Sequence, residues 1–446
     1  MKDYKYTSID LFSGPGGLCT GFKWAGIKPL IAVEWSDWTI KTYAASHDAD
    51  ILDLSGYLKN PSGYKDFFLP SDKTLLIHGD IREVKKDLIK KILKERFDTD
   101  TVDIVSGGAP CESFSMAGDR KEEDYRNHLF LNIIRIAKEV DSKIIFFENV
   151  KGLFSKKIDG VPGKMYQAVC DEFEKKDKEG YGYNLVSRDK DKVLLLAADY
   201  GVPQKRERVF LVSLNNKYPD LKFSYPEHTH GDKTWKKHMT VADALYDLPV
   251  LSSGEESILY DYSLNIVKDD KILEFLEIMR GVRFHAPEHI SFKPTFLSYH
   301  KSVNHRDNIL KRMSLIKQGE TMIDASERMK KNHTWEEFKE YFPKKLYAAR
   351  NRRLDENQPS FTVTSHCLDE MIHPKEDRAL TPREAARLQS FPDWYIFEGP
   401  YVKFHSDPEQ DKYEQIGDAI PPLLAYNLGL ELVKSLNTIS SGDYNG

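Results

Sequence analysis

The first 215 residues alternate short runs of β-branched and aromatic residues with longer amphipathic stretches, and this alternation constrains the fold most. Stretches such as VKKDLIKKILKERF and YRNHLFLNIIRIAKEV carry apolar residues every three or four positions, the period of a helix packed on one face. Alternating strands and helices predict an α/β fold with a mostly parallel, doubly wound sheet covered on both faces. We expect strands at 6–12, 29–34, 74–81, 102–108, 143–150, 192–200 and 208–214.

The sequence after about residue 215 changes in character. It is rich in tyrosine, histidine and charge and has no clear period, which predicts a smaller domain of irregular mixed structure. Order returns near 381–390, where Thr381 is the expected N-cap of a helix and Glu384 follows three residues later. A last apolar helix begins at the double proline and could pack back on the first domain. We therefore expect one domain over 1–215, completed by 408–446, and a second over 216–407.

Composition narrows the class of protein. No run of about eighteen apolar residues and no apolar leader is present, so we expect a soluble, cytoplasmic protein without a membrane association. The four cysteines, at positions 19, 111, 170 and 367, are scattered and lack paired Cys/His spacing. This pattern argues against a disulfide framework and against a metal site.

Charge is unevenly distributed along the chain. The net charge of −5 argues against a polyanionic partner, but residues 293–353 hold 15 Lys and Arg against 7 Asp and Glu. Such a window is either a set of solvated helix faces or a surface that contacts phosphates.

A glycine-rich loop follows the first expected strand, in the stretch DLFSGPGGLCTGF. Gly14, Gly16 and Gly17 would let backbone N–H groups approach a ligand at the start of a helix, although such a loop can also be only a tight turn. Cys19 takes the last glycine position of the dinucleotide fingerprint, so a nicotinamide dinucleotide is disfavoured.

Acidic and aromatic residues end the next two strands. Glu34 is placed to accept hydrogen bonds from ribose hydroxyls, Trp35 could stack on a purine, and Asp80 could accept from an adenine amino group. Each acid alone would be a surface or capping residue. Together with the glycine loop they predict a pocket for an adenosine moiety at the carboxyl edge of the sheet.

A reactive thiol is predicted at the same edge. In SGGAPCESFSMAG, Cys111 follows Pro110 in a loop of small residues, where a sulfur atom is reachable. Glu148 ends the neighbouring strand. Gln204, Arg206 and Arg208 alternate and would share one strand face, where two guanidinium groups would bind an anion or orient Glu148, unless they are a solvated edge.

With these residues in place, the chain resembles the cytosine-C5 DNA methyltransferase family of prokaryotic or phage modification enzymes. The matching motifs occur in the family's order: DLFSGPGG, GGAPCESFS, ENV, QKRER, RALTPREAARLQSFPD and GDAIPP. They cover the first 215 residues and roughly the last 70. The resemblance implies a Rossmann-like catalytic domain and a target-recognition domain over 216–407.

The resemblance also implies the reaction and its residues. The chain would transfer a methyl group from S-adenosyl-L-methionine to C5 of a cytosine flipped out of a specific double-stranded DNA sequence. Cys111 would be the nucleophile, Glu148 would contact the base, and Arg206 and Arg208 would support it. The cofactor would be held by Phe12, Gly14, Gly16, Gly17, Glu34, Trp35, Asp80, Ile81, Pro110 and Asp418.

Two residues depart from the family pattern. Glu112 stands where Gln commonly follows the Pro-Cys pair, and Asp418 stands where Asn commonly follows glycine. We expect altered cofactor affinity and retained catalysis. By analogy with its family the chain would act as a monomer, within a restriction-modification system that has a cognate restriction endonuclease. A tRNA cytosine-C5 methyltransferase and a noncatalytic DNA-binding regulator remain as alternatives.

Overall fold

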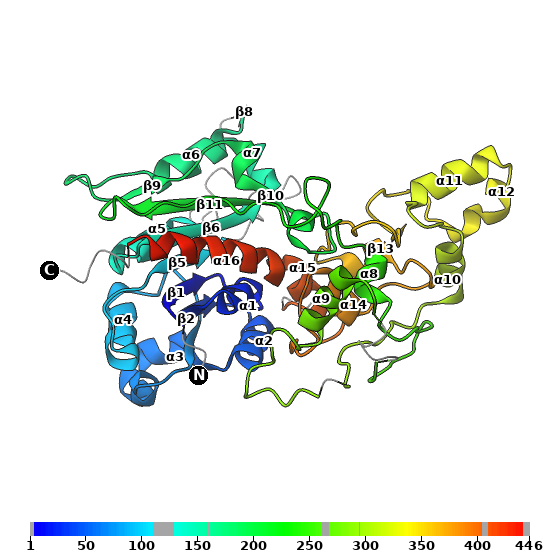
Figure 1. Cartoon of the computed structure of the whole chain (residues 1–446). Helices are drawn as coiled ribbons and strands as arrows, with labels where there is room; N and C mark the ends of the chain where they lie inside the picture. The colour runs from blue at the N-terminus through cyan, green and yellow to red at the C-terminus, as the bar shows by residue number, and fades with distance from the viewer. Residues whose placement is uncertain are drawn as a thin grey trace. The chain divides into compact units, whose positions relative to one another are not determined.

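A computed structural model of the protein (Figure 1) describes residues 4–109, 129–158, 160–260, 267–293, 295–403 and 409–439. Contacts divide the chain into two compact units. Unit 1 comprises Met1–Leu196, Glu207–Glu227 and Pro422–Gly446, and unit 2 comprises Ala197–Arg206 and His228–Pro421. The C-terminal segment thus belongs to the unit that contains the N-terminus. These bounds differ from the expected ones at 215 and 408, and the division of function between the units stays a prediction.

A single large sheet organises unit 1. Its strand order is β10-β11-β6-β5-β1-β2-β4-β3, and β9 pairs with β11. The strands from β6 to β3 in this order run parallel, whereas β11 is antiparallel to β6. The strands are β1 Tyr6–Leu11, β2 Ile27–Glu34, β3 Ala49–Asp53, β4 Thr74–His78, β5 Ile104–Gly107, β6 Ile144–Val150, β9 Tyr183–Leu185, β10 Leu194–Leu196 and β11 Glu207–Asn215.

The strand order reverses its direction at β1. From β1 the chain builds outward through β2 on one side and through β5 and β6 on the other. In open parallel sheets, ligands bind beyond the carboxyl ends of the strands at such a switch point. The ends of β1, β2, β5 and β6 are therefore where a site is expected.

Helices cover both faces of this sheet, as the alternation predicts. One face packs against α4 Lys86–Lys91 and its continuation η2 Ile92–Arg96, α5 Leu131–Glu139 and α6 Lys164–Phe173, which bury their apolar stripes in the main core. On the other face, α1 Gly17–Trp24 and α2 Asp37–His47 pack over β2 and β4. The doubly wound α/β fold is confirmed.

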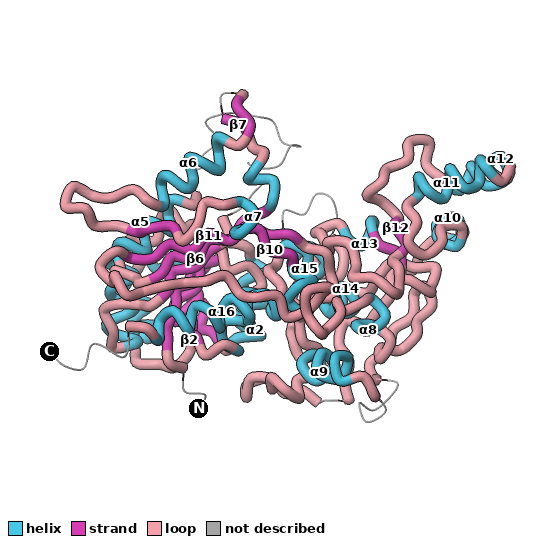
Figure 2. Tube along the Cα trace, turned by 45° about the horizontal axis from the view of Figure 1, so that its top comes forward, coloured by secondary structure: helices cyan, strands magenta, loops and turns pink. Residues whose placement is uncertain are grey.

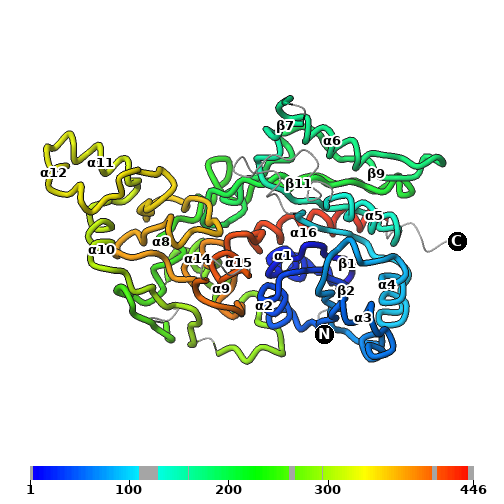
Figure 3. Tube along the Cα trace, turned by 180° about the vertical axis from the view of Figure 1, so that it is seen from behind, coloured from blue at the N-terminus to red at the C-terminus, as the bar shows by residue number. Residues whose placement is uncertain are grey.

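The last helix, α16 Pro422–Asn437, lies along α1 (Figures 1 and 3). The two backbones approach closely at Gly21, where an added Cβ would lie 2.5 Å from Ala425 Cβ. The predicted helix at the double proline is confirmed, and its packing explains why glycine stands at position 21.

Some expected elements differ from those observed in unit 1. β3 and β9 were not anticipated. The expected strand at 192–200 forms only β10, between α7 Lys190–Val193 and η6 Ala197–Tyr200. The strand expected at 74–81 ends at His78, so Asp80 and Ile81 lie in the turn that follows. Short elements complete the unit: α3 Leu54–Lys59, η1 Pro61–Phe68, η5 Lys151–Phe154, β7 Lys157–Ile158 and β8 Val161–Pro162.

Unit 2 consists of short helices joined by long loops (Figure 2). Thr381 caps α14 in a capping box with Glu384, as predicted. The expectation that the region has no regular period was wrong for α9, α10 and α11, which are amphipathic. The elements are α8 Val241–Leu245, α9 Asp270–Met279, α10 Asp307–Ser314, α11 Met322–Lys331, α12 Trp335–Phe338, η8 Lys339–Tyr341, β12 Arg352–Arg353, α13 Cys367–Glu370, β13 Met371–Ile372, α14 Pro382–Leu388 and α15 Lys412–Asp418.

The described residues contain no membrane-spanning helix and no cluster of metal-binding side chains. None of their helices has both the length and the apolar character needed to cross a membrane. In the same parts of the chain, no group of three or more His, Cys, Asp or Glu side chains could hold a metal ion.

Candidate active site

A charged pair lies at the end of β6. Glu148 is paired with Phe210 across the antiparallel β6–β11 ladder, and Arg208 with Val150, so the two side chains are diagonal neighbours on one face. Arg208 Nε lies 3.1 Å from Glu148 Oε1, and the two side chains are 14% and 13% exposed. Partial burial strengthens this attraction. Arg208 therefore fixes the Glu148 carboxylate while leaving it within reach of a ligand.

The chain leaving β5 runs directly beside this carboxylate. Gly107 pairs with Phe147 in the parallel β5–β6 ladder, and a Cβ added to Gly108 would lie 2.8 Å from Glu148 Oε2. Asn149 Nδ2 donates to the Ala109 carbonyl at 3.3 Å. A side chain at position 108 would therefore require the Glu148 carboxylate to shift. Pro110, Cys111 and Glu112 lie outside the described residues, and Gly108 precedes Cys111 by three positions.

Arg206 is held differently from Arg208. Its guanidinium group is buried in unit 2 and donates to the carbonyls of Val363 (2.9 Å) and Gly417 (2.8 Å). Gln204, in the same unit, donates to Gln389 Oε1 at 3.0 Å. The expectation that these side chains share a strand face with Arg208 was wrong, because β11 begins only at Glu207 and Gln204 instead bridges to Ser360.

The glycine-rich loop joins β1 to α1 through left-handed backbone. Phe12, Gly14 and Gly16 have φ of 56°, 55° and 95°. Gly16 is the N-cap of α1, and Gly17 is its first residue. A Cβ at Gly14 would meet nothing within 4 Å, so this side of the loop has room for a ligand. Left-handed φ at Phe12 is uncommon for a bulky residue and marks local strain of the kind found at binding sites.

Glu34 ties this loop to the end of β2. Its Oε2 accepts from Gly14 N at 2.9 Å, and its Oε1 accepts from the backbone N–H groups of Trp35 (2.8 Å) and Ser36 (3.0 Å). Burial raises the pKa of the Glu34 carboxyl, and the three N–H donors partly oppose this shift. The Trp35 ring beside it is 69% exposed. The loop, the carboxyl and an accessible aromatic ring are thus brought together.

The remaining predicted cofactor residues are engaged elsewhere. Asp80 accepts from Arg82 N and Nε, both at 2.9 Å, and this pairing with Arg82 lowers the pKa of the Asp80 carboxyl. Ile81 is buried in the main core. Asp418 belongs to unit 2, where its Oδ2 accepts from Gln410 Nε2 at 2.7 Å.

Sequence reasoning missed Asp10. This residue of β1 is 3% exposed, and its Oδ1 accepts from the Ser106 hydroxyl at 3.0 Å. Asp10 Oδ2 and Ser13 Oγ are buried without a hydrogen-bond partner in the described structure. Burial, with the nearby Glu34 charge as a smaller cause, raises the pKa of Asp10 to about 7. An acid inside an apolar strand was the only sequence indication.

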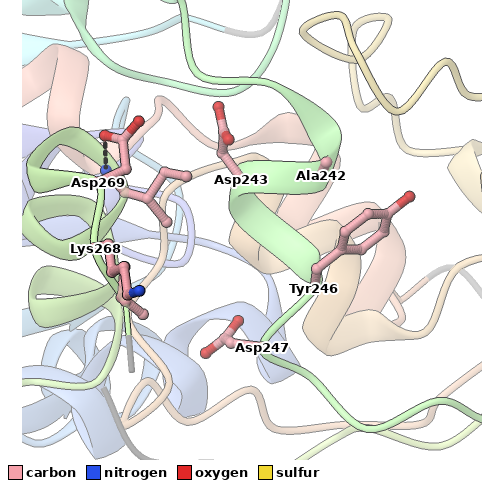
Figure 4. A pocket seen from close by; sticks show the side chains of 8 residues that line it. Ala242, Asp243, Tyr246, Asp247, Lys268 and Asp269 are labelled. Atoms are coloured by element: carbon pink, nitrogen blue, oxygen red, sulfur yellow. Dashed lines mark hydrogen bonds between the residues drawn. The ribbon is translucent and has the colours of Figure 1, made fainter. Parts of the chain in front are cut away.

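A cavity of about 340 Å³ occurs in unit 2 rather than at these residues (Figure 4). Its three carboxylates are already engaged: Asp243 with Lys271, Asp247 with Arg280, and Asp269 with the N-terminus of α9. None of the predicted site residues lines it.

The sequence matches a known protein family. The profile of the family described as C-5 cytosine-specific DNA methylase matches residues 6–434. Among relatives, the type II methyltransferase M.DdeI of Desulfomicrobium norvegicum is 30% identical, over 94% of this chain and 86% of that protein. The type II methyltransferase M1.HphI of Haemophilus parahaemolyticus is 30% identical, over 97% of this chain and 87% of that protein.

Solved structures also match the chain. The crystal structure of a putative DNA modification methyltransferase encoded within a prophage of E. coli superposes with a TM-score of 0.67 at 25% identity, covering 97% of this chain and all of that one. Because the family profile spans nearly the whole sequence, the chain belongs to the C-5 cytosine-specific DNA methylase family.

Proposed function

We propose that this DNA cytosine-5 methyltransferase uses Cys111 as its nucleophile and Glu148, fixed by Arg208, as the residue that activates the base. The observation that carries the proposal is the shielded Glu148–Arg208 pair beside Gly108, at the chain segment that leads to Cys111. A thiol and an oriented carboxyl group can then act on one pyrimidine ring from neighbouring strand ends.

The chemistry of cytosine requires this pair of groups. C5 of cytosine is too weak a nucleophile to attack a methyl donor. Addition of the Cys111 thiolate to C6, with Glu148 stabilising a proton at N3, converts the ring into an enamine that is electron-rich at C5. Once C5 carries the methyl group, loss of the C5 proton restores the double bond and expels the thiolate. The C5 proton leaves to water and carries away the positive charge of the sulfonium, and the N3 proton returns to Glu148.

The family implies S-adenosyl-L-methionine as methyl donor, and the residues at the glycine-rich loop fit it. Glu34 would accept from the ribose hydroxyls and the exposed Trp35 ring would stack on the adenine. The open space at Gly14 supports a ligand site here, as do Asp10 Oδ2 and Ser13 Oγ, which are buried and have no hydrogen-bond partner among the described residues. When bound, this group supplies an electrophilic methyl on a sulfonium.

The substrate of this family is DNA. The target carbon lies inside the stacked duplex, so the cytosine must be extruded, at a cost of about a few kcal/mol. We propose that unit 2, which contains the basic window 293–353, supplies the contacts that offset this cost and select the sequence. Because relatives are named type II methyltransferases, we further propose that the protein protects DNA from a restriction endonuclease.

Bisulfite sequencing tests this function. A plasmid from a methylation-deficient host expressing the wild-type chain should show protected cytosines at one recurring sequence. Cys111→Ser should abolish the protection. Complete conversion at every cytosine in the wild-type sample would remove the proposal, and protection undiminished by Cys111→Ser would remove the mechanism. Methyl label transferred only to tRNA, offered beside duplex DNA, would replace the substrate.

A further inference from the structure

A buried chain of polar side chains lies behind the glycine-rich loop. Tyr43 of α2 donates its hydroxyl to Cys19 Sγ of α1 at 3.1 Å, and Cys19 Sγ lies 3.5 Å from His47 Nδ1. All three residues are almost completely buried. The proposed chemistry uses none of them.

Hydrogen-bond geometry assigns the histidine tautomer. His47 Nε2 lies 3.2 Å from the Gly16 carbonyl oxygen, which can only accept, and 3.3 Å from Thr20 Oγ1, which donates its own proton to Gly16 O. Nε2 therefore carries a proton. Burial raises the pKa of the Cys19 thiol to about 12, so Cys19 keeps its proton and can donate to Nδ1. The donors therefore run in one direction: Tyr43 to Cys19, Cys19 to His47, and His47 to Gly16.

The end point of this chain controls a peptide plane. The Gly16 carbonyl also accepts from Thr20 N (2.9 Å) and Thr20 Oγ1 (2.8 Å), so three donors hold it. In a trans peptide the carbonyl and the following N–H point in opposite directions. Fixing the Gly16 carbonyl thus directs the Gly17 N–H outward, among the first amides of α1 that have no acceptor within the helix.

We propose that His47, oriented by Cys19 and Tyr43, is a positioning residue that aims the Gly17 amide at the carboxylate of the methionyl moiety of the cofactor. This inference rests on the proposed function, because it takes the glycine-rich loop as the cofactor site.

Two substitutions of His47 test the proposal in the full chain. His47→Leu removes the Nε2 donor, whereas the amide nitrogen of His47→Gln reaches a similar position and keeps it. We expect His47→Leu to raise the Kd for S-adenosyl-L-methionine about tenfold, equivalent to ~1.4 kcal/mol. kcat at saturating cofactor should change little, because the lost interaction stabilises the bound cofactor equally in the ground state and in the transition state. His47→Gln should remain within about twofold of wild type.

Controls separate positioning from general destabilisation. His300→Leu removes another buried histidine, bonded to Pro249 O in unit 2, and should leave the cofactor Kd unchanged. If His47→Leu does not fold, Cys19→Ala should still raise the Kd about threefold, because the His47 imidazole ring loses the Cys19 contact that orients it. Equal Kd values for wild type, His47→Leu and Cys19→Ala would overturn the inference. A wild-type chain that binds no cofactor would instead overturn the proposed function.

A second, independent observation concerns the loop 231–237 of unit 2. Its Trp235 side chain is 85% exposed although the loop is closed at its base. Gly231 N donates to the Lys236 carbonyl at 2.8 Å, and the Asp199 carboxylate contacts His238 Nε2 at 2.8 Å. A defined loop therefore presents a large aromatic ring to solvent.

Free cations flank this ring. Lys233 and Lys237 are exposed and form no ion pair in the described parts of the chain, whereas Lys236 pairs with Glu274 and lies 5.1 Å from the centre of the Trp235 ring. Aromatic rings beside unpaired lysines are typical of nucleic-acid contacts. We infer that loop 231–237 contacts duplex DNA, with Lys233 and Lys237 on phosphates and Trp235 against a sugar or base.

The salt dependence of DNA binding tests this contact. Replacing Lys233 and Lys237 by alanine should lower the slope of log K against log salt by about 1.8, or 0.9 per phosphate contact. Trp235→Ala should weaken binding, because it removes the aromatic contact, and should leave the slope unchanged. Replacing Lys59 and Lys65, two exposed lysines of unit 1, is the matched control and should not change the slope. An unchanged slope and affinity in the loop variants would overturn the inference.

Discussion

Asp10 shows how a buried group can make stability depend on pH. Its folded-state pKa of about 7 lies above the ordinary value of 3.8 because burial disfavours the charged form. The folded chain therefore keeps a proton on Asp10 that the unfolded chain loses above about pH 4. By linkage, the free energy of unfolding falls as pH rises from about 4 to about 7, and this loss persists above pH 7.

Asp10→Asn tests this linkage, because the amide has a similar shape and does not titrate. Between pH 4 and pH 8 the free energy of unfolding of the wild type should fall by up to about 4 kcal/mol more than that of the variant. The pKa of Asp10 differs by about three units between the folded and unfolded chains, and each unit corresponds to ~1.4 kcal/mol. Urea unfolding at four pH values measures the difference. Parallel pH profiles for the two proteins would contradict the assignment.

Arg206 and Arg208 differ in what their loss should do. Arg208→Met removes the cation that fixes Glu148, and we expect kcat to fall about 10²-fold, with a smaller loss of stability than in Arg206→Met because the pair is only partly buried. Arg206→Met leaves the buried carbonyls of Val363 and Gly417 without this donor, and we expect about 2–4 kcal/mol of lost stability. Steady-state kinetics and urea unfolding of both variants distinguish the roles. The opposite assignment of the two losses would contradict this account.

Elements that pack through a wide apolar stripe could be predicted from the sequence, and elements fixed by tertiary context could not. Burial on both faces gives β1, β2, β5 and β6 continuous apolar runs, and these runs can be recognised in the sequence. β3, at the edge of the sheet, buries only Leu52, and β9 has three residues and buries only Tyr183, so burial demands little of either sequence. In unit 2, Asp269 and Thr321 are N-cap residues of α9 and α11 that the sequence shows. Each helix has only 10 residues, too few for its apolar period to stand out from the surrounding loops.

The crossing of α1 and α16 depends on a small residue. Gly21→Ala places a Cβ 2.5 Å from both Ala425 Cβ and the Pro422 carbonyl oxygen, so the two helices must separate. Overpacking of this kind costs about 1–3 kcal/mol. Thermal and urea unfolding should show this loss, and Lys434→Ala on the exposed side of α16 should not. A Gly21→Ala protein as stable as wild type would contradict the packing.

In the whole molecule, the proximity of side chains at neighbouring strand ends could be predicted from the sequence. Contacts between segments far apart in the sequence could not. Parallel strands bring their carboxyl ends to one edge, so the predicted proximity of Glu148 to the chain entering Cys111 follows from topology. The anchoring of Arg206 depends on Val363 and Gly417, far along the chain, and no local pattern encodes it.

The interior of unit 2 illustrates the same limit. Arg387 is buried between Asp247 and Asp393, and Arg280 shares Asp247, so charges from distant segments meet in one network. Asp247→Asn would leave two buried guanidinium groups without a full counter-charge. Breaking a buried pair in this way costs about 3–5 kcal/mol, which urea unfolding can measure. A loss of stability below about 1 kcal/mol, the value typical of exposed ion pairs, would show that this charge network is not shielded from water.

The proposed reaction requires the sulfur of Cys111 to bond transiently to C6 of an extruded cytosine. The most direct measurement uses duplex DNA with 5-fluorocytosine at the target position, identified first by bisulfite sequencing. With the methyl donor present, the fluorine at C5 prevents the final elimination. We expect a denaturation-stable protein–DNA adduct that peptide mass spectrometry assigns to Cys111 and that Cys111→Ser abolishes. An adduct at another residue, or none from wild-type protein that methylates the unmodified duplex, would contradict it.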